Sequence, residues 1–166
     1  MYTLTDLNQL DLESFTQTLG AIFEDTPTIA RQAWFQRPFR DRAALHRAMV
    51  AVVEAMSPAE QLALIRAHPD LGSRAKMAAA SVQEQASVGL DQLTAAEYDR
   101  FQALNRAYRD KFDFPFIIAV RNHTKTSILQ AFEQRLGHSA DEERQRALTE
   151  IYQIADGRLA AIVTSD

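Results

Sequence analysis

Two residues of the chain, His68 and Glu84, have side chains suited to proton transfer. A histidine titrates near neutral pH, and a carboxylate at its other ring nitrogen fixes the tautomer and raises the basicity. An apolar stretch ends at His68-Pro69, and the residue before a proline is pushed out of the α region, so we expect His68 at a helix end. Glu84 lies in the next predicted helix, and Gly72 between them lets the chain fold back. We therefore expect the two side chains to meet across a pocket.

The same residues also have an ordinary structural interpretation. Ser81-x-x-Glu84 matches a capping box, in which the serine and the glutamate bond each other's backbone amides at a helix start. The same pattern occurs three more times, at Ser57-x-x-Glu60, Thr94-x-x-Glu97 and Ser139-x-x-Glu142. His68 could equally be a cation at the C-terminus of a helix or a surface histidine. Spacing alone leaves both interpretations open.

Composition limits the classes of function. The chain has 166 residues, of which 46% are hydrophobic and 24% charged, which favours one domain over residues 1–166. A net charge of −4 lacks the basic footprint of a nucleic-acid-binding protein, so small substrates or protein partners are expected. The absence of cysteine excludes disulfides, thiolate nucleophiles and cysteine metal sites. A metal hydrolase would need His46, His68, Asp70 and His123, which lack metal-ligand spacing, so no metal is expected.

The sequence also shows none of the common targeting motifs. The first residues alternate polar and apolar types and lack the basic and apolar regions of a secretory signal. No stretch approaches the ~18 apolar residues of a membrane span. The last residues, Val163-Thr-Ser-Asp166, do not form a peroxisomal Ser-Lys-Leu address. The expected location is the cytoplasm, with no membrane partner.

Hydrophobic periodicity predicts an all-α fold. Apolar residues recur at three-to-four spacing in most of the chain, and serine, threonine or aspartate stands at most helix starts. We predict a single-domain bundle of about eight helices and no pair of strands. The predicted helices cover residues 4–19 (one or two segments), 28–35, 41–56, 57–67, 81–90, 94–112, 122–136 and 139–164.

One stretch near residues 114–120 does not fit the helical pattern. It reads Phe114-Pro-Phe-Ile-Ile-Ala-Val120, in which the proline opposes a helix and the rest is apolar, partly β-branched, and without helical spacing. We predict a buried extended segment whose amides and carbonyls need partners other than those of a helix. A bound polar heterocycle and neighbouring loop backbone are the two alternatives.

Three linked motifs follow one another along the chain. They are His68-Pro69-Asp70-Leu71-Gly72, then Ser81-x-x-Glu84-Gln85 with Gly89-Leu90, then Phe112-x-Phe114-Pro115-Phe116-Ile117 running into Val120-Arg121-Asn122 and Lys125. These motifs resemble those of the OHCU decarboxylase family, whose members are 2-oxo-4-hydroxy-4-carboxy-5-ureidoimidazoline decarboxylases of urate breakdown. The order of the motifs, the gaps between them and the chain length all agree with the family.

The resemblance implies an all-helical, cofactor-free homodimer that converts a ureidoimidazoline substrate to (S)-allantoin. It makes His68 the catalytic acid and Glu84 its partner. It also implies a set of substrate-binding residues, with Arg158 as an anion contact and the 116–120 stretch contributing its backbone. That set is Pro69, Ser81, Val82, Gln83, Glu84, Gln85, Phe116, Ile117, Ile118, Ala119, Val120 and Arg158. The alternative of another class is a non-catalytic helical ligand-binding or interaction domain.

Overall fold

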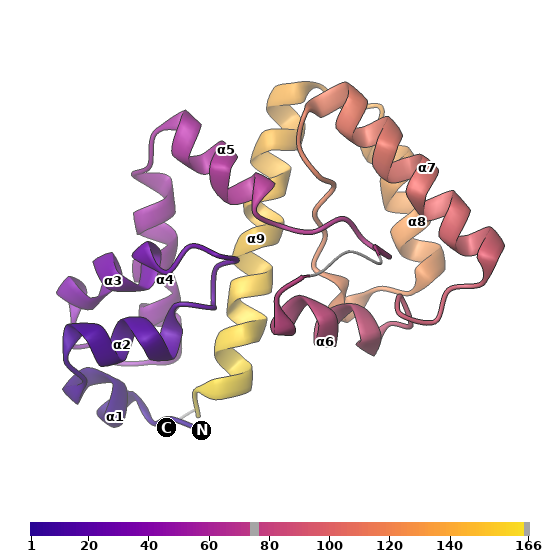
Figure 1. Ribbon diagram of the computed structural model, residues 1–166. Coiled ribbons are helices and arrows are strands. Elements are labelled where there is room, and N and C mark those ends of the chain that lie inside the picture. The colour runs from indigo at the N-terminus through magenta and orange to yellow at the C-terminus, as the bar shows by residue number, and fades with distance from the viewer. Residues whose placement is uncertain (74–76, 165–166) are drawn as a thin grey trace. The chain divides into compact units, whose positions relative to one another are not determined.

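Helices make up most of the chain in the computed structural model, which describes residues 1–73 and 77–164 (Figure 1). Ser165 and Asp166, part of the C-terminal sequence considered above, lie outside the described residues. Within the described ranges there are nine α-helices, two single-turn 3-10 helices and no strand, only an isolated bridge between Tyr2 and Val163. The all-α prediction is confirmed, with nine α-helices where about eight were expected.

The helices follow the predicted order closely. Residues 4–19 form two helices, and each later predicted helix has one α-helical counterpart. The elements are α1 Leu4–Gln9, α2 Leu12–Leu19, α3 Thr28–Ala33, η1 Trp34–Gln36, α4 Arg42–Glu54, α5 Pro58–Arg66, α6 Ala79–Ser87, α7 Ala95–Phe112, η2 Val120–Asn122, α8 Lys125–Arg135 and α9 Ala140–Ile162.

The chain divides into two compact units. Unit 1 comprises Met1–Ala67 and Tyr152–Asp166, and unit 2 comprises His68–Ile151. In unit 1, α3 packs against α2 and α4 over a core that includes Phe15, Leu45 and Met49. The isolated bridge between Tyr2 and Val163 also belongs to this unit, so the start of the chain lies beside the end of α9 (Figure 1). The single domain over residues 1–166 stays a prediction.

Unit 2 is built on α7 and α8, which pack against each other around an aromatic cluster. Tyr108 is fully buried at its centre and contacts four phenylalanines. The rings of Phe116 and Phe132 stack with centroids 3.7 Å apart. The ring contacts of Tyr108 are with Phe112, Phe114, Phe116 and Phe132.

Capping boxes account for three of the four serine or threonine patterns. Both reciprocal bonds form at Ser57/Glu60 and Thr94/Glu97, and Ser139 and Glu142 bond each other's amides in the same way. The pattern at Ser81/Glu84 is different, because α6 begins at Ala79 and its N-cap, Ala78, makes no side-chain bond. The capping-box interpretation of Ser81 and Glu84 is therefore wrong, and both side chains lie within the helix.

Within the described residues, no single helix has the length and apolar character needed to cross a membrane. The pair α4 and α5 meets that test only when taken together, with a bend of 117° between its members.

Unit 2 opens with a turn that requires glycine at position 72. The backbone of Gly72 has φ +66°, and a Cβ at this position would lie 2.8 Å from Leu93 Cδ1. Left-handed backbone is unfavourable for residues with a Cβ, and a contact this short forces a neighbour to move.

We predict that Gly72→Ala lowers the free energy of unfolding by about 2 kcal/mol. Gly137→Ala is the matched control, because its backbone is not left-handed and the nearest atom to its Cβ lies 3.4 Å away. Urea denaturation of both variants measures the difference, and equal stabilities would contradict the strain assigned to Gly72.

Candidate active site

His68 lies directly after the C-terminus of α5. The helix ends at Arg66 with Ala67 as its C-cap, so the predicted position of His68 at a helix end is confirmed. Its side chain is buried, with 6% of the residue exposed, and the following Pro69 is half-buried. A surface location for this histidine is therefore wrong, and the imidazole lies in a protected environment at the start of unit 2.

Three hydrogen bonds to side chains of α6 and α7 fix the loop that begins at His68. The Gly72 amide donates to Gln85 Oε1 of α6 at 2.9 Å, in a buried position. From α7, Asn105 Nδ2 donates to the Leu71 carbonyl at 2.8 Å, and Arg109 Nε donates to Asp70 Oδ1 at 2.9 Å. The structure thus holds the His68 loop against the helix that carries Glu84.

One face of α6 gathers three of the predicted residues. Ser81 and Gln85 are buried one turn apart, and Glu84, three residues after Ser81, is half-buried on the same side. Val82 and Gln83 are exposed on the other side of the helix. The structure therefore brings Ser81, Glu84 and Gln85 together and places the side chains of Val82 and Gln83 apart from them.

The predicted extended segment is buried along its whole length from Phe114 to Val120, and it has no helix before η2 (Figure 1). Of the two expected kinds of partner, neighbouring loop backbone bonds Val120, whose carbonyl accepts from the His123 amide at 2.9 Å. Side chains bond two other backbone groups of the segment. Arg135 Nη1 of α8 donates to the Ile117 carbonyl at 2.6 Å. The Ala119 amide donates to Glu150 Oε2 of α9 at 3.3 Å. Within residues 1–73 and 77–164, the amide and carbonyl of Ile118 have no hydrogen-bond partner.

A buried charged network lies behind this segment. Glu143 is completely buried and accepts hydrogen bonds from Tyr108 Oη at 2.6 Å, Arg135 Nε at 2.8 Å and His138 Nδ1 at 2.9 Å. Burial and the bond to Glu143 raise the pKa of Tyr108, so its hydroxyl stays protonated and remains a donor. The Arg135 guanidinium also lies over the Phe116 ring, 4.2 Å from its centroid.

A second charged pair holds the other end of the segment. Glu150 is buried, with 2% exposed, and its Oε1 accepts from Arg146 Nη2 at 2.8 Å. Neither Glu143 nor Glu150 was predicted as a functional residue. A signal was present, because Glu143, Ala147 and Glu150 fall on one face of the last helix and Ala147 is fully buried.

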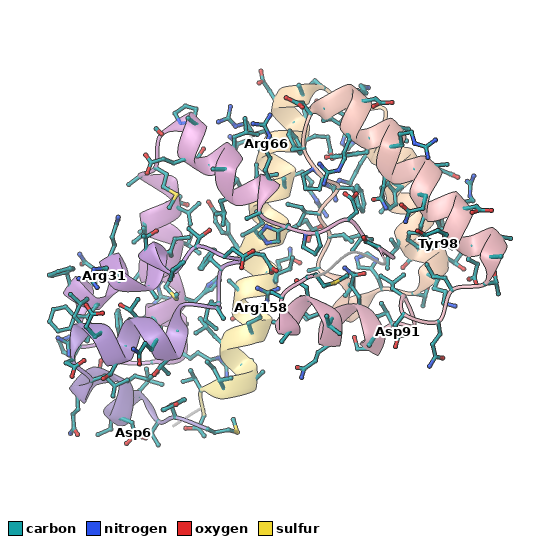
Figure 2. All side chains as sticks on the ribbon, in the orientation of Figure 1. Asp6, Arg31, Arg66, Asp91, Tyr98 and Arg158 are labelled. Carbon is teal, nitrogen blue, oxygen red and sulfur yellow. The ribbon has the colours of Figure 1, made fainter. Side chains whose placement is uncertain are left out.

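Arg158 belongs to unit 1 and lies on α9 (Figure 2). Its Nη2 donates to Glu24 Oε2 at 2.8 Å, and both side chains are buried. Its Nη1 also faces the carbonyls of Ala21 and Ile22, at 3.3 and 3.5 Å. Glu24 was not predicted as a partner of Arg158, and its carboxylate balances the charge that was predicted to contact an anion.

The other histidines considered as metal ligands have protein partners. His46 Nε2 lies 2.8 Å from the Tyr152 carbonyl, and His123 Nδ1 lies 3.0 Å from Ser127 Oγ. Among the described residues no three potential metal ligands cluster together. A groove of about 640 Å³ in unit 1, along α4 and the segment before it, is lined by none of the predicted site residues.

Comparison with known proteins assigns the chain to a family. The family model for OHCU decarboxylase matches residues 8–160. A 2-oxo-4-hydroxy-4-carboxy-5-ureidoimidazoline decarboxylase of Halalkalicoccus jeotgali is 47% identical over 157 residues, which cover 95% of this chain and 89% of the relative. The Haloferax volcanii protein of the same name is 44% identical over 99% of this chain and 98% of its own length.

A solved structure, that of an (S)-allantoin synthase, is also similar. It has a TM-score of 0.79 and 32% sequence identity, and the match covers 99% of this chain and 54% of that chain. The match of the family model and the two near full-length relatives agree with one another. The chain belongs to the OHCU decarboxylase family.

Proposed function

We propose that this protein decarboxylates 2-oxo-4-hydroxy-4-carboxy-5-ureidoimidazoline to (S)-allantoin in urate breakdown, without a cofactor. The observation that carries the proposal is the family match over residues 8–160, which includes the His68 loop, α6 and the extended segment. Relatives that bear this enzyme name align with nearly the whole chain. The protein is a carbon–carbon lyase.

The reaction breaks one carbon–carbon bond and makes one carbon–hydrogen bond. The substrate carboxylate is attached to a ring carbon next to a C=N group, so the electron pair released with CO2 can spread into the ring. Loss of CO2 moves the electron pair through a new carbon–carbon double bond onto the ring nitrogen, which takes up a proton. The neighbouring carbon that carries the ureido group then receives a proton from one side, while the hydroxyl loses its proton and becomes a ring carbonyl. The protein must orient the carboxylate out of the ring plane, stabilise the developing negative charge and deliver the proton to one face.

His68 is the proposed proton donor. An imidazolium can hold a proton near neutral pH and release it to a carbanion-like carbon. Burial at the end of α5 limits exchange of that proton with water, and the bonds that fix residues 70–72 restrict where the imidazole can point. Delivery from one fixed direction accounts for a single enantiomer of the product.

Glu84 is proposed to orient His68 and to keep it basic. Its place on the same face of α6 as Ser81 and Gln85 supports this role, because Gln85 bonds the loop that starts at His68. The half-buried carboxylate is less screened by water than one on the open surface. Ser81 and Pro69 are proposed to border the same substrate site.

The extended segment is proposed to bind the ureido and ring amides through its backbone. Amides of the substrate are both donors and acceptors, and a peptide group offers both in return. The Ile118 amide and carbonyl, which have no partner within the described residues, fit this role. Phe116 and Val120 would shield the site from water, since both side chains are buried.

We further propose that the enzyme acts as a cytoplasmic homodimer, as the family resemblance implies. Light scattering of the purified protein measures its mass in solution and decides between a monomer and a dimer.

The proposed activity is tested by producing the substrate in place from urate and following circular dichroism with and without the protein. Spontaneous decay gives racemic allantoin, whereas the enzyme should give one hand. Binding of allantoin without faster release of CO2 would instead indicate a non-catalytic binding domain.

We predict that His68→Asn lowers kcat by about 10²–10⁴-fold and removes the stereospecific signal, because the proton donor is lost. The far-ultraviolet spectrum should remain that of the folded protein. His46→Asn is the matched control, since this imidazole bonds a backbone carbonyl in unit 1. Full activity of the His68 variant would end the assignment.

We predict that Glu84→Gln lowers kcat by about tenfold or more, but by less than His68→Asn does, because the donor remains while its orienting charge is lost. Glu133→Gln serves as the control, since this exposed carboxylate on α8 forms a surface ion pair with Arg100. Steady-state kinetics of both variants provide the measurement. An unchanged kcat in Glu84→Gln would remove Glu84 from the mechanism.

We predict that Arg158→Gln lowers the free energy of unfolding by about 3–5 kcal/mol, because it leaves the Glu24 carboxylate buried without its charged partner. Adding Glu24→Gln should recover much of that stability. If Arg158 also contacts the substrate carboxylate, the stable double variant still shows a raised KM. Wild-type KM in the double variant would show that the arginine has a structural role only.

A further inference from the structure

Two ion pairs, one buried and one with a half-exposed arginine, hold the backbone of the extended segment on either side of one residue. Arg135, oriented by Glu143, bonds the Ile117 carbonyl, and Glu150, paired with Arg146, accepts from the Ala119 amide. These bonds come from α8 and α9. The residue between the two held positions is Ile118.

Stability is a poor explanation for the first of these pairs. Arg135 and Glu143 are only 4% and 0% exposed, and the desolvation of two such charges commonly outweighs their attraction. One guanidinium nitrogen, Arg135 Nη2, is buried without a hydrogen-bond partner among the described residues, which adds to that penalty. Apolar side chains of similar volume could fill the same space at no loss of stability. What they could not supply is the bond to the Ile117 carbonyl.

The positions of the two bonds define which backbone amides and carbonyls of the segment remain available to bind a ligand. Ala119 is extended, with φ −74° and ψ 100°. In extended backbone the polar groups of a residue face the opposite edge from those of its neighbours, so Ile117 and Ala119 face one edge and Ile118 the other. Both bonded groups belong to the edge that faces α8 and α9. The amide and carbonyl of Ile118 are left without a partner in the described chain.

We propose that Arg135 and Glu150 are positioning residues, which fix the peptide groups of Ile118 at the place where the substrate amides bind. This inference rests on the proposed function and extends it to side chains that do not touch the substrate. A displacement of about 1 Å in a binding group can lower the rate by about 10²-fold, so a backbone binding site needs rigid support. Helices α8 and α9 supply that support through charged side chains.

The first test changes Glu150. Glu150→Gln keeps an oxygen that can accept from the Ala119 amide, whereas Glu150→Leu has none. Arg146 is half exposed, so water can solvate it in either variant. We expect KM to rise about tenfold in Glu150→Leu and to stay within about threefold of wild type in Glu150→Gln, because only the former loses the bond. Amide hydrogen exchange at residues 117–119 should be faster in Glu150→Leu alone.

The second test removes the other pair without leaving a buried charge. In Arg135→Met/Glu143→Gln both charges disappear, and the glutamine can still accept from Tyr108. We expect this double variant to fold and to lose about 100-fold in kcat/KM, because the Ile117 carbonyl is no longer held. The pH profile of kcat should keep its wild-type shape, since His68 is not altered.

A core variant outside the segment serves as the control for general loss of stability. Met49→Ala in α4 creates a cavity in the core of unit 1. We expect its KM and kcat to stay within about twofold of wild type at a temperature where it is folded. Equal KM values in Glu150→Leu, Glu150→Gln and wild type, together with unchanged exchange at residues 117–119, would overturn the positioning role.

Failure of the proposed function gives a different result. In that case wild-type protein does not accelerate formation of (S)-allantoin, whatever the variants do. Hydrogen exchange is measured without substrate, so it reports the support of the segment independently. Faster exchange in Glu150→Leu with an active wild type and an unchanged KM would show that the ion pairs hold the segment but do not serve binding, which also overturns the inference.

Discussion

The bond from Arg135 to the Ile117 carbonyl addresses the main physical constraint on unit 2, which is a buried stretch of backbone without secondary structure. Buried peptide groups need hydrogen-bond partners, and a helix or sheet normally provides them. Residues 114–119 have neither, yet every one of them is buried. Side chains of α8 and α9 take over that task. Because Arg135 is charged and buried, it needs a charged partner. Glu143 is that partner, and Tyr108 and His138 also bond it.

Sequence patterns predicted local structure well because local chemistry decides it. The cap, proline and glutamate at residues 57–60 mark the start of α5, and this fixes where His68 emerges. The proline and apolar residues of 114–120 correctly indicated a buried segment that is not helical. The Ser81 pattern failed because Ala79 and Ala80, residues of the highest helix propensity, extend α6 toward its N-terminus. Because α6 begins before Ser81, Ser81 and Gln85 lie one turn apart on one buried face of the helix.

Partners far apart in the chain could not be predicted in this way. Glu24 and Arg158 are 134 positions apart, and Ala119 and Glu150 are 31 apart. A glutamate in a charged helix is usually solvated, and the sequence analysis made no prediction for Glu143 or Glu150. Helical spacing places both on one face with Ala147, but the partners that surround them depend on tertiary packing, which periodicity does not encode. The family motifs predicted which backbone would contact the substrate, but they gave no information on what holds that backbone.

The buried hydroxyl of Tyr108 also makes the chain sensitive to strong alkali. Its pKa is raised in the folded state, so the contribution to stability is complete below the ordinary tyrosine value of about 10 and is lost as the pH rises above it. Because the folded protein resists forming this phenolate, ionisation and loss of the aromatic cluster are linked. The ultraviolet absorbance of the Tyr108 tyrosinate therefore reports unfolding of unit 2, the part of the chain that contains the extended segment.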